Sequence, residues 1–531
     1  MKRINILNLI FSIFLSISIN LKLVIDKNLD YFIKKFHIDI MFIIKVILLS
    51  ILIYFLLKVL FLLFDKIPLK NKKLILDKKK TILIFISIFI TSMLYLIVYY
   101  PATFLNDTLY MLYGPLHRGS PIIYGIFMSI LFFSLKSFVT PTIAVFIMSI
   151  IQAIVASIIL TYVITWFNKR FNNEILTIIL ICYYVFMPII ASYNIALNKD
   201  SPFSLMILLF FVFIFEIVES KGKVLTDKKF LLNIFLASIF ASYIRNNGLF
   251  VVLTSLLIVF SIYGFKKYRK QSLIVLSLVV MFSFVPPIAS KLLHAEHLKR
   301  EWYTVPIQQV GYLGKYHSNR LTDEDYKVLS KFINNPKKTL KKHYDVFTVD
   351  ELKFNKNFDR YKFNDYSKEF LHLWISKYPN NISPYTKSYL LNSYHLWSIN
   401  KFDRSQSVIY GTAVFGIKKS RHIYHKEILP KNIQEKLLRF YYKTCVYLNP
   451  AACFILLLII NLYALERKKK DIVVLSVPLL SLWFVLILGS PYSSALRYMA
   501  PYIYILPILM LYTFKITRKD VRNGLSRKSK K

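Results

Sequence analysis

Asp107 is the first residue whose chemistry stands out, because it closes the segment YYPATFLND (residues 99–107) directly after a long apolar run. A carboxylate at the edge of a membrane is costly to desolvate, so a residue of this kind is a functional candidate. It is suited to act as a general base that takes a proton from a hydroxyl group. A solvated loop aspartate or a helix cap is an equal alternative on residue type alone. His117 follows in the same loop and is a candidate for substrate contact.

Asp200 is the second candidate, and it lies in the segment NKDSP (residues 198–202) immediately before another apolar run. An aspartate followed two positions later by proline is a good helix N-cap, and this explanation is sufficient by itself. The alternative is a functional role, in which Asp200 binds a metal ion or pairs with Lys199 at a phosphate site.

Arg245 and Arg497 are isolated cations at the ends of apolar runs, in the segments YIRNNG (residues 243–248) and SSALRY (residues 493–498). The topology derived below places both on the outer side, where arginine is disfavoured. A planar guanidinium suits bidentate binding of a phosphate or pyrophosphate. Contact with lipid headgroups is an alternative of equal weight.

The composition indicates that these residues belong to an integral membrane protein. Of the 531 residues, 56% are apolar, above the 45–50% of an average soluble protein, and they gather in long runs nearly free of charge. Such runs can cross the roughly 30 Å of a bilayer's hydrocarbon core as helices, the structure that satisfies its own backbone in lipid. We expect about twelve membrane-spanning helices. The predicted spans are residues 5–25, 41–64, 81–100, 141–167, 174–191, 203–218, 230–244, 249–264, 272–291, 441–463, 471–489 and 497–514.

The basic loops set the predicted topology. Lys and Arg cluster at residues 70–80, 169–170, 221–229, 266–270, 467–470 and in the tail from 515, and the positive-inside rule places all of them in the cytoplasm. This arrangement requires twelve crossings. The further apolar stretch 121–135 would reverse every later loop if it crossed the membrane, and it is short for a span. We therefore predict that 121–135 re-enters the membrane or lies along its outer surface, with both termini in the cytoplasm.

The stretch 292–440 differs from the rest because it is polar and charged. The segment LTDED (residues 321–325) predicts a helix start, with Thr322 as the N-cap and acidic residues in the first turn. We predict a mostly helical extracytoplasmic domain here. The complete division is a membrane module at 1–291 with an outer loop at 101–140, this domain at 292–440, further spans at 441–514 and a basic cytoplasmic tail at 515–531.

The net charge of +42 does not indicate a nucleic-acid partner. The basic residues lie in short loops that set the topology and meet anionic lipid headgroups, and they form no basic stripe interleaved with aromatic residues. Membrane lipids are the partners that this charge pattern predicts.

The order of these elements resembles the GT-C glycosyltransferase superfamily and, more narrowly, an uncharacterised bacterial membrane family associated with it. The resemblance covers most of residues 95–500. The segments that carry it are Tyr100-Pro101 with Asp107, Asn198-Lys199-Asp200, Arg245-Asn246-Asn247-Gly248, Val305-Pro306-Ile307-Gln308-Gln309, Leu321–Asp325, Tyr389–Trp397 and Arg497-Tyr498. Two departures occur. His117-Arg118-Gly119-Ser120-Pro121 stands where the resemblance predicts His-His-Pro, and Asn106-Asp107 replaces a pair of acidic residues, which weakens the prediction of a metal.

The resemblance implies an inverting transfer of a sugar from a polyprenyl-phosphate donor to a glycan or polymer acceptor at the outer membrane face, in envelope assembly. Asp107 would be the general base, and Arg245 and Arg497 would hold the donor phosphate. Lys199 with Asp200 would hold the phosphate or a divalent metal, Mg²⁺ or Mn²⁺. Two other functions remain as alternatives, a transporter or flippase for a lipid-linked saccharide and a non-enzymatic envelope assembly protein. The spans are apolar through their centres, which disfavours the transporter.

Overall fold

The protein is all-helical in the computed structural model, which describes residues 5–66, 74–103, 106–116, 121–296, 298–399, 430–445, 448–489 and 496–528. These residues contain no β-strand. Their only β-type pairings are two isolated bridges, Thr103 with Ala196 and Ile333 with Phe358. The predicted all-α class is therefore confirmed for this part of the chain.

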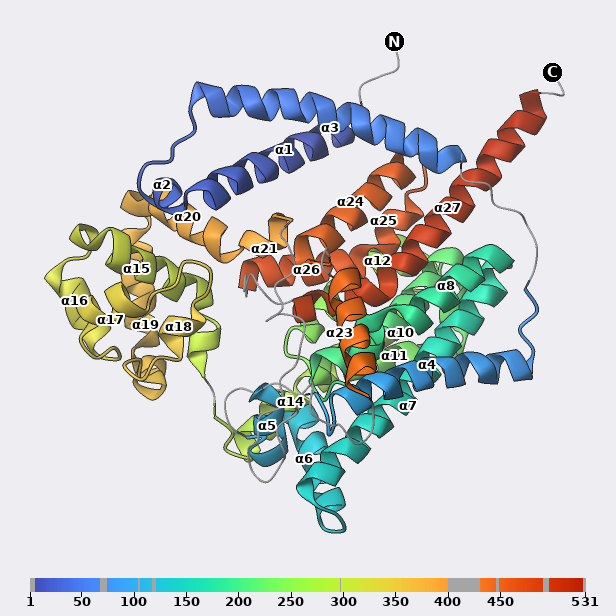
Figure 1. Ribbon diagram of the computed structural model, residues 1–531, viewed down its shortest axis with the longest axis horizontal. Coiled ribbons are helices and arrows are strands. Elements are labelled where there is room, and N and C mark those ends of the chain that lie inside the picture. Colours follow the sequence, from blue (N-terminus) through green and yellow to red (C-terminus); the bar gives the residue numbers. More distant parts are fainter. Residues whose placement is uncertain are drawn as a thin grey trace.

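The helices before the polar region form a hairpin and most of a bundle (Figure 1). They are α1 (Ile6–Lys27), α2 (Leu29–Lys34), α3 (Ile40–Lys66), α4 (Lys78–Val98), α5 (Asn106–Tyr113), α6 (Ile122–Lys136), α7 (Pro141–Phe171), α8 (Glu174–Phe186), α9 (Pro188–Asn194), α10 (Asp200–Glu219), α11 (Lys228–Ile244), α12 (Gly248–Val259), α13 (Arg269–Ser283) and α14 (Val285–Leu292). A single turn of π-helix, η2 (Phe260–Gly264), extends α12.

Helices α15–α20 form the polar region, and five described helices after it complete the bundle. The former are α15 (Thr304–Tyr316), α16 (Asp323–Ser330), α17 (Pro336–His343), α18 (Asp350–Lys353), α19 (Arg360–Lys377) and α20 (Ile382–Asn392), followed by α21 (Tyr394–Trp397). The bundle resumes with α23 (Lys431–Cys445), α24 (Pro450–Glu466), α25 (Asp471–Leu475), α26 (Val477–Gly489) and α27 (Ala500–Lys528). The 3₁₀ turns η1 (Lys223–Thr226), η3 (Lys299–Glu301), η4 (Ser318–Arg320), η5 (Pro379–Asn381) and η6 (Leu496–Met499) connect them.

Seven described helical segments are long and apolar enough to cross a membrane, and α8 with α9 makes an eighth if this pair, bent by 59°, is one span. Four more apolar helices are shorter, among them α6 and the combination of α12 with η2. Each predicted span overlaps helical residues. A membrane protein with several spanning helices is thus confirmed, whereas the number twelve stays a prediction, as does a re-entrant or interfacial position for 121–135.

The predicted span 441–463 begins too early, because α24 starts only at Pro450. Asn449 ends the preceding segment, since its side chain accepts the Ala452 N–H at 2.9 Å and Pro450 fixes the first helical residue. Hydropathy alone does not place this start, whereas the pair Asn449-Pro450 in the sequence is a signal for it.

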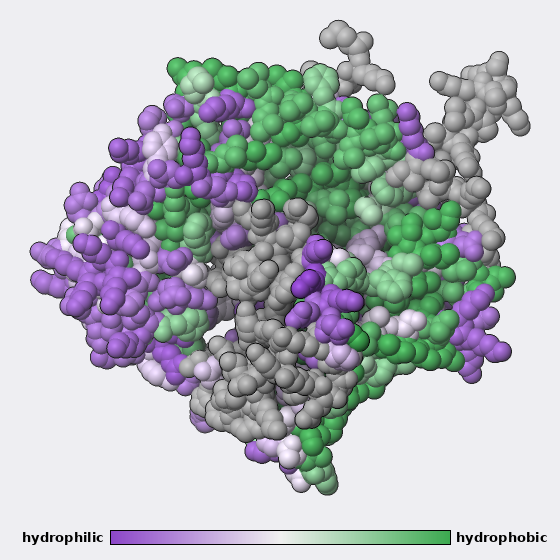
Figure 2. Space-filling model, viewed as in Figure 1, coloured by the Kyte–Doolittle hydropathy of each residue, from purple (hydrophilic) through white to green (hydrophobic). Residues whose placement is uncertain are grey.

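The polar region has its own core, built from apolar side chains of α15–α20 such as Leu313, Phe332 and Phe370. Thr322 caps α16 as predicted and forms a reciprocal capping box with Asp325. Figure 2 shows that hydrophilic side chains gather over this region, while hydrophobic ones cover the α1–α3 hairpin and the visible bundle. The domain boundaries given above stay predictions.

The bundle centres on α10 and α27, each with 72% of its apolar window buried. Helix α10 packs against α7, α11 and α27, and α12 packs against α26. By contrast, α3 has only 22% of its window buried and exposes an almost continuous apolar surface. Because α10 lies among the other helices, the residues at its N-terminus meet loops from several distant parts of the chain.

Candidate functional site

Five of the ionisable residues singled out in the sequence come together in one ionic cluster, which consists of Asp107, Lys199, Asp200, Arg245 and Arg497. The Lys199 Nζ lies 3.3 Å from the Asp107 Oδ2, and an Arg497 nitrogen lies 3.6 Å from the same oxygen. The same Arg497 nitrogen lies 3.8 Å from the Asp200 Oδ2. Arg245 donates to the Asp200 Oδ1 at 2.6 Å. Arg497 therefore bridges the two carboxylates.

The cluster depends on two loops that are held side by side. Thr103, just before α5, forms a parallel bridge with Ala196, and the Leu197 N–H donates to the Thr103 carbonyl at 2.9 Å. The Thr108 hydroxyl, one position after Asp107, donates to the Leu197 carbonyl. Gln152 of α7 adds a hydrogen bond of 2.7 Å to the Ala196 carbonyl. These contacts bring α5 to the N-terminus of α10.

Asp200 is not the N-cap that the sequence predicts. It is the first residue of α10, and the capping hydrogen bond comes from Asn198, whose Oδ1 accepts the Ser201 N–H at 2.8 Å. The carboxylate of Asp200 is consequently released from the backbone and faces the arginines. It is completely buried, and its Oδ2 has no hydrogen-bond partner among the described residues, although Arg497 lies at ion-pair distance.

Arg245 reaches Asp200 from the tight turn between α11 and α12. Its guanidinium lies over the ring of Tyr498, at 4.4 Å from the centroid, and at 5.6 Å from that of Phe203. Gly248 allows this turn, because a Cβ at that position would lie 2.2 Å from the Ala241 carbonyl oxygen. The sequence RNNG thus combines a buried cation with the glycine that brings two helices close enough to bury it.

The cluster has a buried half and an accessible half. The side chains of Arg245 and Asp200 are 6% and 0% exposed, whereas those of Lys199 and Arg497 are 21% and 22% exposed. Asp107 is the most accessible, at 43%. Three cations face two carboxylates, so these five side chains carry an excess positive charge that favours an anion.

The neighbouring cations also determine the acidity of Asp107. The Lys199 ammonium, assisted by Arg497 and Arg245, lowers the pKa of the Asp107 carboxyl to about 2, although burial acts in the opposite direction. The side chain is therefore a carboxylate at any physiological pH. A carboxylate with such a low pKa is a weak base as long as these cations remain in place.

A divalent metal does not fit this arrangement. Among the described residues, no three His, Cys, Asp or Glu side chains gather in a way that could hold a metal ion. Asp200 is occupied by Arg245, and the surrounding cations repel a further positive charge. We therefore derive no step through Mg²⁺ or Mn²⁺. His117 lies outside the described residues.

Tyr498 is the residue of this site to which the sequence gives no role. Its ring supports both arginines, since the Arg497 guanidinium lies 4.7 Å from the ring centroid and donates to the Tyr498 hydroxyl at 2.9 Å. The sequence signal that could have identified Tyr498 is its position next to an isolated arginine, because aromatic faces stabilise guanidinium groups.

The comparisons with known proteins identify a family without a described activity. The profile of a family described as a family of unknown function, DUF6020, matches residues 120–527, well over half of the chain. The matched segment includes Lys199, Asp200, Arg245 and Arg497, and it begins after Asp107. No curated protein matches the chain, and no solved structure matches it.

We expect Asp200→Asn to destabilise the folded protein by about 3–5 kcal/mol, because it leaves the Arg245 guanidinium buried without its carboxylate. The measurement is the thermal unfolding midpoint of the full chain in detergent. Asp200→Asn combined with Arg245→Met should recover part of this loss, since the uncompensated charge is gone.

Asp323→Asn is the matched control for this prediction. Asp323 also pairs with a cation, Lys337, but its side chain is 82% exposed, so its loss should change the midpoint little. Equal destabilisation by the single and double variants would show that the two buried side chains are not coupled.

Proposed function

The chain belongs to the DUF6020 family of unknown function, and we propose that it is a glycosyltransferase using a polyprenyl-phosphate-linked sugar as donor. The proposed reaction takes place at the outer face of the cell membrane and extends an envelope glycan or glycopolymer. The observation that carries the proposal is the ionic cluster, in which an accessible carboxylate, Asp107, lies within ion-pair distance of two accessible cations, Lys199 and Arg497.

The chemistry requires a base and an anion site close together. An acceptor hydroxyl oxygen attacks the anomeric carbon of the donor sugar, and its proton passes to the Asp107 carboxylate. The bond from the anomeric carbon to the phosphate oxygen breaks, and its electron pair leaves with the polyprenyl phosphate. Lys199 and Arg497 stabilise the negative charge that develops on this leaving group. Attack opposite to the departing phosphate inverts the anomeric configuration.

The buried and accessible halves of the cluster have different roles in this proposal. The sequence assigns Arg245 to the phosphate, but its burial and its 2.6 Å contact with Asp200 favour a positioning role. Asp200 in turn helps to position Arg497, since its Oδ2 lies 3.8 Å from the Arg497 nitrogen that also faces Asp107. The donor phosphate is therefore proposed to contact Lys199 and Arg497.

Donor binding itself can activate the base. In the free protein the two accessible cations face Asp107 and keep its pKa low. A donor phosphate competes for the same cations and adds a negative charge nearby, and both effects raise the pKa of Asp107. Asp107 then becomes a stronger base when the donor is in place, which couples proton removal to the presence of substrate.

The membrane context agrees with a lipid-linked donor. Long apolar helices support residence in the membrane, and the basic loops of the sequence favour cytoplasmic termini with 292–440 outside. A donor with a polyprenyl tail is delivered from within the bilayer, so an enzyme that uses it has reason to be embedded there.

We expect Asp107→Asn to lower kcat at least 100-fold while donor binding persists, because the amide cannot accept the hydroxyl proton. The assay measures release of polyprenyl phosphate from donor lipids extracted from native membranes, with the purified full chain in nanodiscs. Asp471→Asn is the matched control, since this carboxylate has nearly the same exposure, 44%, and also pairs with a lysine. Full activity of Asp107→Asn would overturn the proposal in favour of an envelope assembly protein.

Loss of either accessible cation should weaken donor binding. A hydrogen bond to a charged group contributes about 1.5–3 kcal/mol, so Arg497→Gln and Lys199→Gln should each reduce affinity for polyprenyl phosphate roughly tenfold or more. Native mass spectrometry of the nanodisc-purified chain can measure this affinity. Lys221→Gln is the control, because Lys221 also pairs with an aspartate but lies outside the cluster. Unchanged affinity in both cluster variants would contradict the assignment.

The pH profiles of kcat/KM and kcat should differ, because kcat/KM reports the pKa of Asp107 in the free protein and kcat reports it in the donor complex. The lowered pKa of Asp107 means that the base is lost only as the pH falls towards about 2, so kcat/KM should stay flat down to about pH 4. In the complex the pKa rises, and kcat should begin to fall at a higher pH than kcat/KM. Acid limbs at the same pH for both constants would show that the donor does not displace the cations from Asp107.

A further inference from the structure

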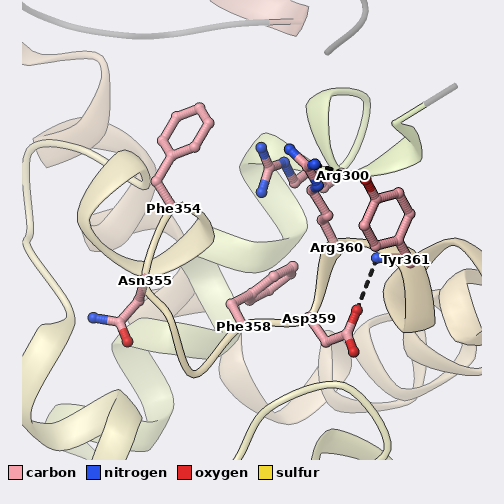
Figure 3. Close-up of a pocket in the computed structure, with 7 residues that line it drawn as sticks. All are labelled: Arg300, Phe354, Asn355, Phe358, Asp359, Arg360 and Tyr361. Atoms are coloured by element: carbon pink, nitrogen blue, oxygen red, sulfur yellow. Dashed lines mark hydrogen bonds between the residues drawn. The ribbon is translucent and has the colours of Figure 1, made fainter. Parts of the chain in front are cut away.

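We propose that a hollow in the polar helical region binds an anionic sugar unit and that it holds the acceptor glycan. As an acceptor site it rests on the proposed function, but as a binding site it can be tested without any turnover. The hollow has a volume of about 280 Å³, close to the lower end for ligand pockets, which suits a single sugar-sized group rather than a lipid tail. Its lining residues are Arg300, Phe354, Asn355, Phe358, Asp359, Arg360 and Tyr361 (Figure 3).

Two arginines give the hollow its affinity for an anion. Arg300 is 4% exposed and held in place, since it donates to the Lys353 carbonyl at 2.7 Å and its guanidinium lies 4.5 Å from the centroid of the Phe354 ring. Its Nε also lies 3.4 Å from the Glu301 Oε1, so this carboxylate balances part of its charge. Arg360 is the first residue of α19, and its guanidinium lies 4.7 Å from the centroid of the Tyr361 ring at the edge of the same hollow. Figure 3 shows both guanidinium side chains reaching the same hollow.

The carboxylate that lines the hollow is already committed to the backbone. Asp359 caps α19, and its Oδ1 accepts the N–H groups of Tyr361 and Lys362 at 3.0 and 3.1 Å. Its charge is therefore directed at the helix N-terminus. The region as a whole is basic, with seventeen Lys and Arg against ten Asp and Glu in residues 298–399. A long anionic polymer is attracted to such a surface.

Two exposed aromatic rings favour a sugar over a simple anion. Phe354 and Tyr361 are 54% and 51% exposed, although large aromatic side chains are usually buried. Arg300 lies over one face of the Phe354 ring and Arg360 over one face of the Tyr361 ring, so the flat C–H face of a sugar would pack on the opposite faces. The hydroxyl groups of the sugar can bond the amide of Asn355. A phosphate or carboxylate on the sugar would meet the arginines.

The hollow is joined to the loop that follows Asp107. The Tyr361 hydroxyl donates to the Glu296 Oε1 at 2.9 Å, and the Glu296 N–H donates to the Leu116 carbonyl at 2.8 Å. Leu116 closely follows α5, the helix that carries Asp107. Two hydrogen bonds thus connect Tyr361 of the hollow to Leu116, which follows the helix that carries Asp107.

The test is binding of glucose 6-phosphate, glucuronic acid, glucose and inorganic phosphate to the full chain in detergent, measured by isothermal titration calorimetry. We expect the two anionic sugars to bind at least tenfold more tightly than glucose or phosphate. Arg360→Gln and Phe354→Ala should each weaken this binding about tenfold. Lys342→Gln, which removes an exposed cation of α17 outside the hollow, should leave it unchanged.

The outcomes separate this proposal from that of the previous subsection. Phosphate binding as tight as that of glucose 6-phosphate, equal binding of glucose, or an equal loss in Lys342→Gln would each overturn the anionic-sugar site. Asp107→Asn should retain sugar binding, because the base takes no part in it. Absence of sugar binding together with loss of turnover in Asp107→Asn would refute the acceptor site alone. Sugar binding with full turnover in Asp107→Asn would refute the proposed chemistry alone.

Discussion

The ion pair between Asp200 and Arg245 is the constraint on which the rest of the site depends. A fully buried carboxylate is tolerated only next to a cation, and a buried guanidinium needs the carboxylate equally. Satisfying both fixes the N-terminus of α10 against the turn between α11 and α12. The ring of Tyr498 lies over the Arg245 guanidinium and thereby holds η6 next to this ion pair. Three distant parts of the chain are held by one pair.

The accessible half of the cluster follows from this buried half. With one carboxylate and one arginine neutralising each other, Lys199 and Arg497 remain to balance Asp107 alone. The surplus cation favours an anion, and in the proposed reaction the donor phosphate then raises the pKa of Asp107. The buried pair of Asp200 and Arg245 holds the site in place, while the accessible Asp107 can change its pKa when a charged substrate binds. The proposed donor, with its single phosphate, matches this charge balance.

The sequence predicted the members of the cluster better than their roles. Isolated charges beside apolar runs are costly, and this cost alone identified Asp107, Arg245 and Arg497. The role of Asp200 could not be predicted, because Asn198 and Asp200 are both good N-cap residues for α10. Asn198 makes the capping hydrogen bond, and Asp200 instead pairs with Arg245, which lies 45 residues later in the chain. Tyr498 was missed for a similar reason, since its partners come from other elements.

Local signals predicted local structure and failed where tertiary contacts decide. Thr322 and its acidic neighbours specify a capping box within four residues, and the structure contains it. The bend between α8 and α9, and the late start of α24 at Pro450, interrupt apolar runs that look continuous. Hydropathy measures how well a residue tolerates lipid, and it does not distinguish one long helix from two short ones of the same composition.

The two parts of the proposed site are separable in the sequence. The cations Lys199, Arg245 and Arg497 lie within the segment that matches the DUF6020 family, whereas Asp107 precedes it. The buried pair that positions the cations makes no use of α5. Asp107 joins them through its ion pairs with Lys199 and Arg497, the bridge of Thr103 with Ala196 and the hydrogen bond from Thr108. In the proposed reaction, anion binding therefore rests on the bundle itself, and base catalysis rests on a loop docked to it.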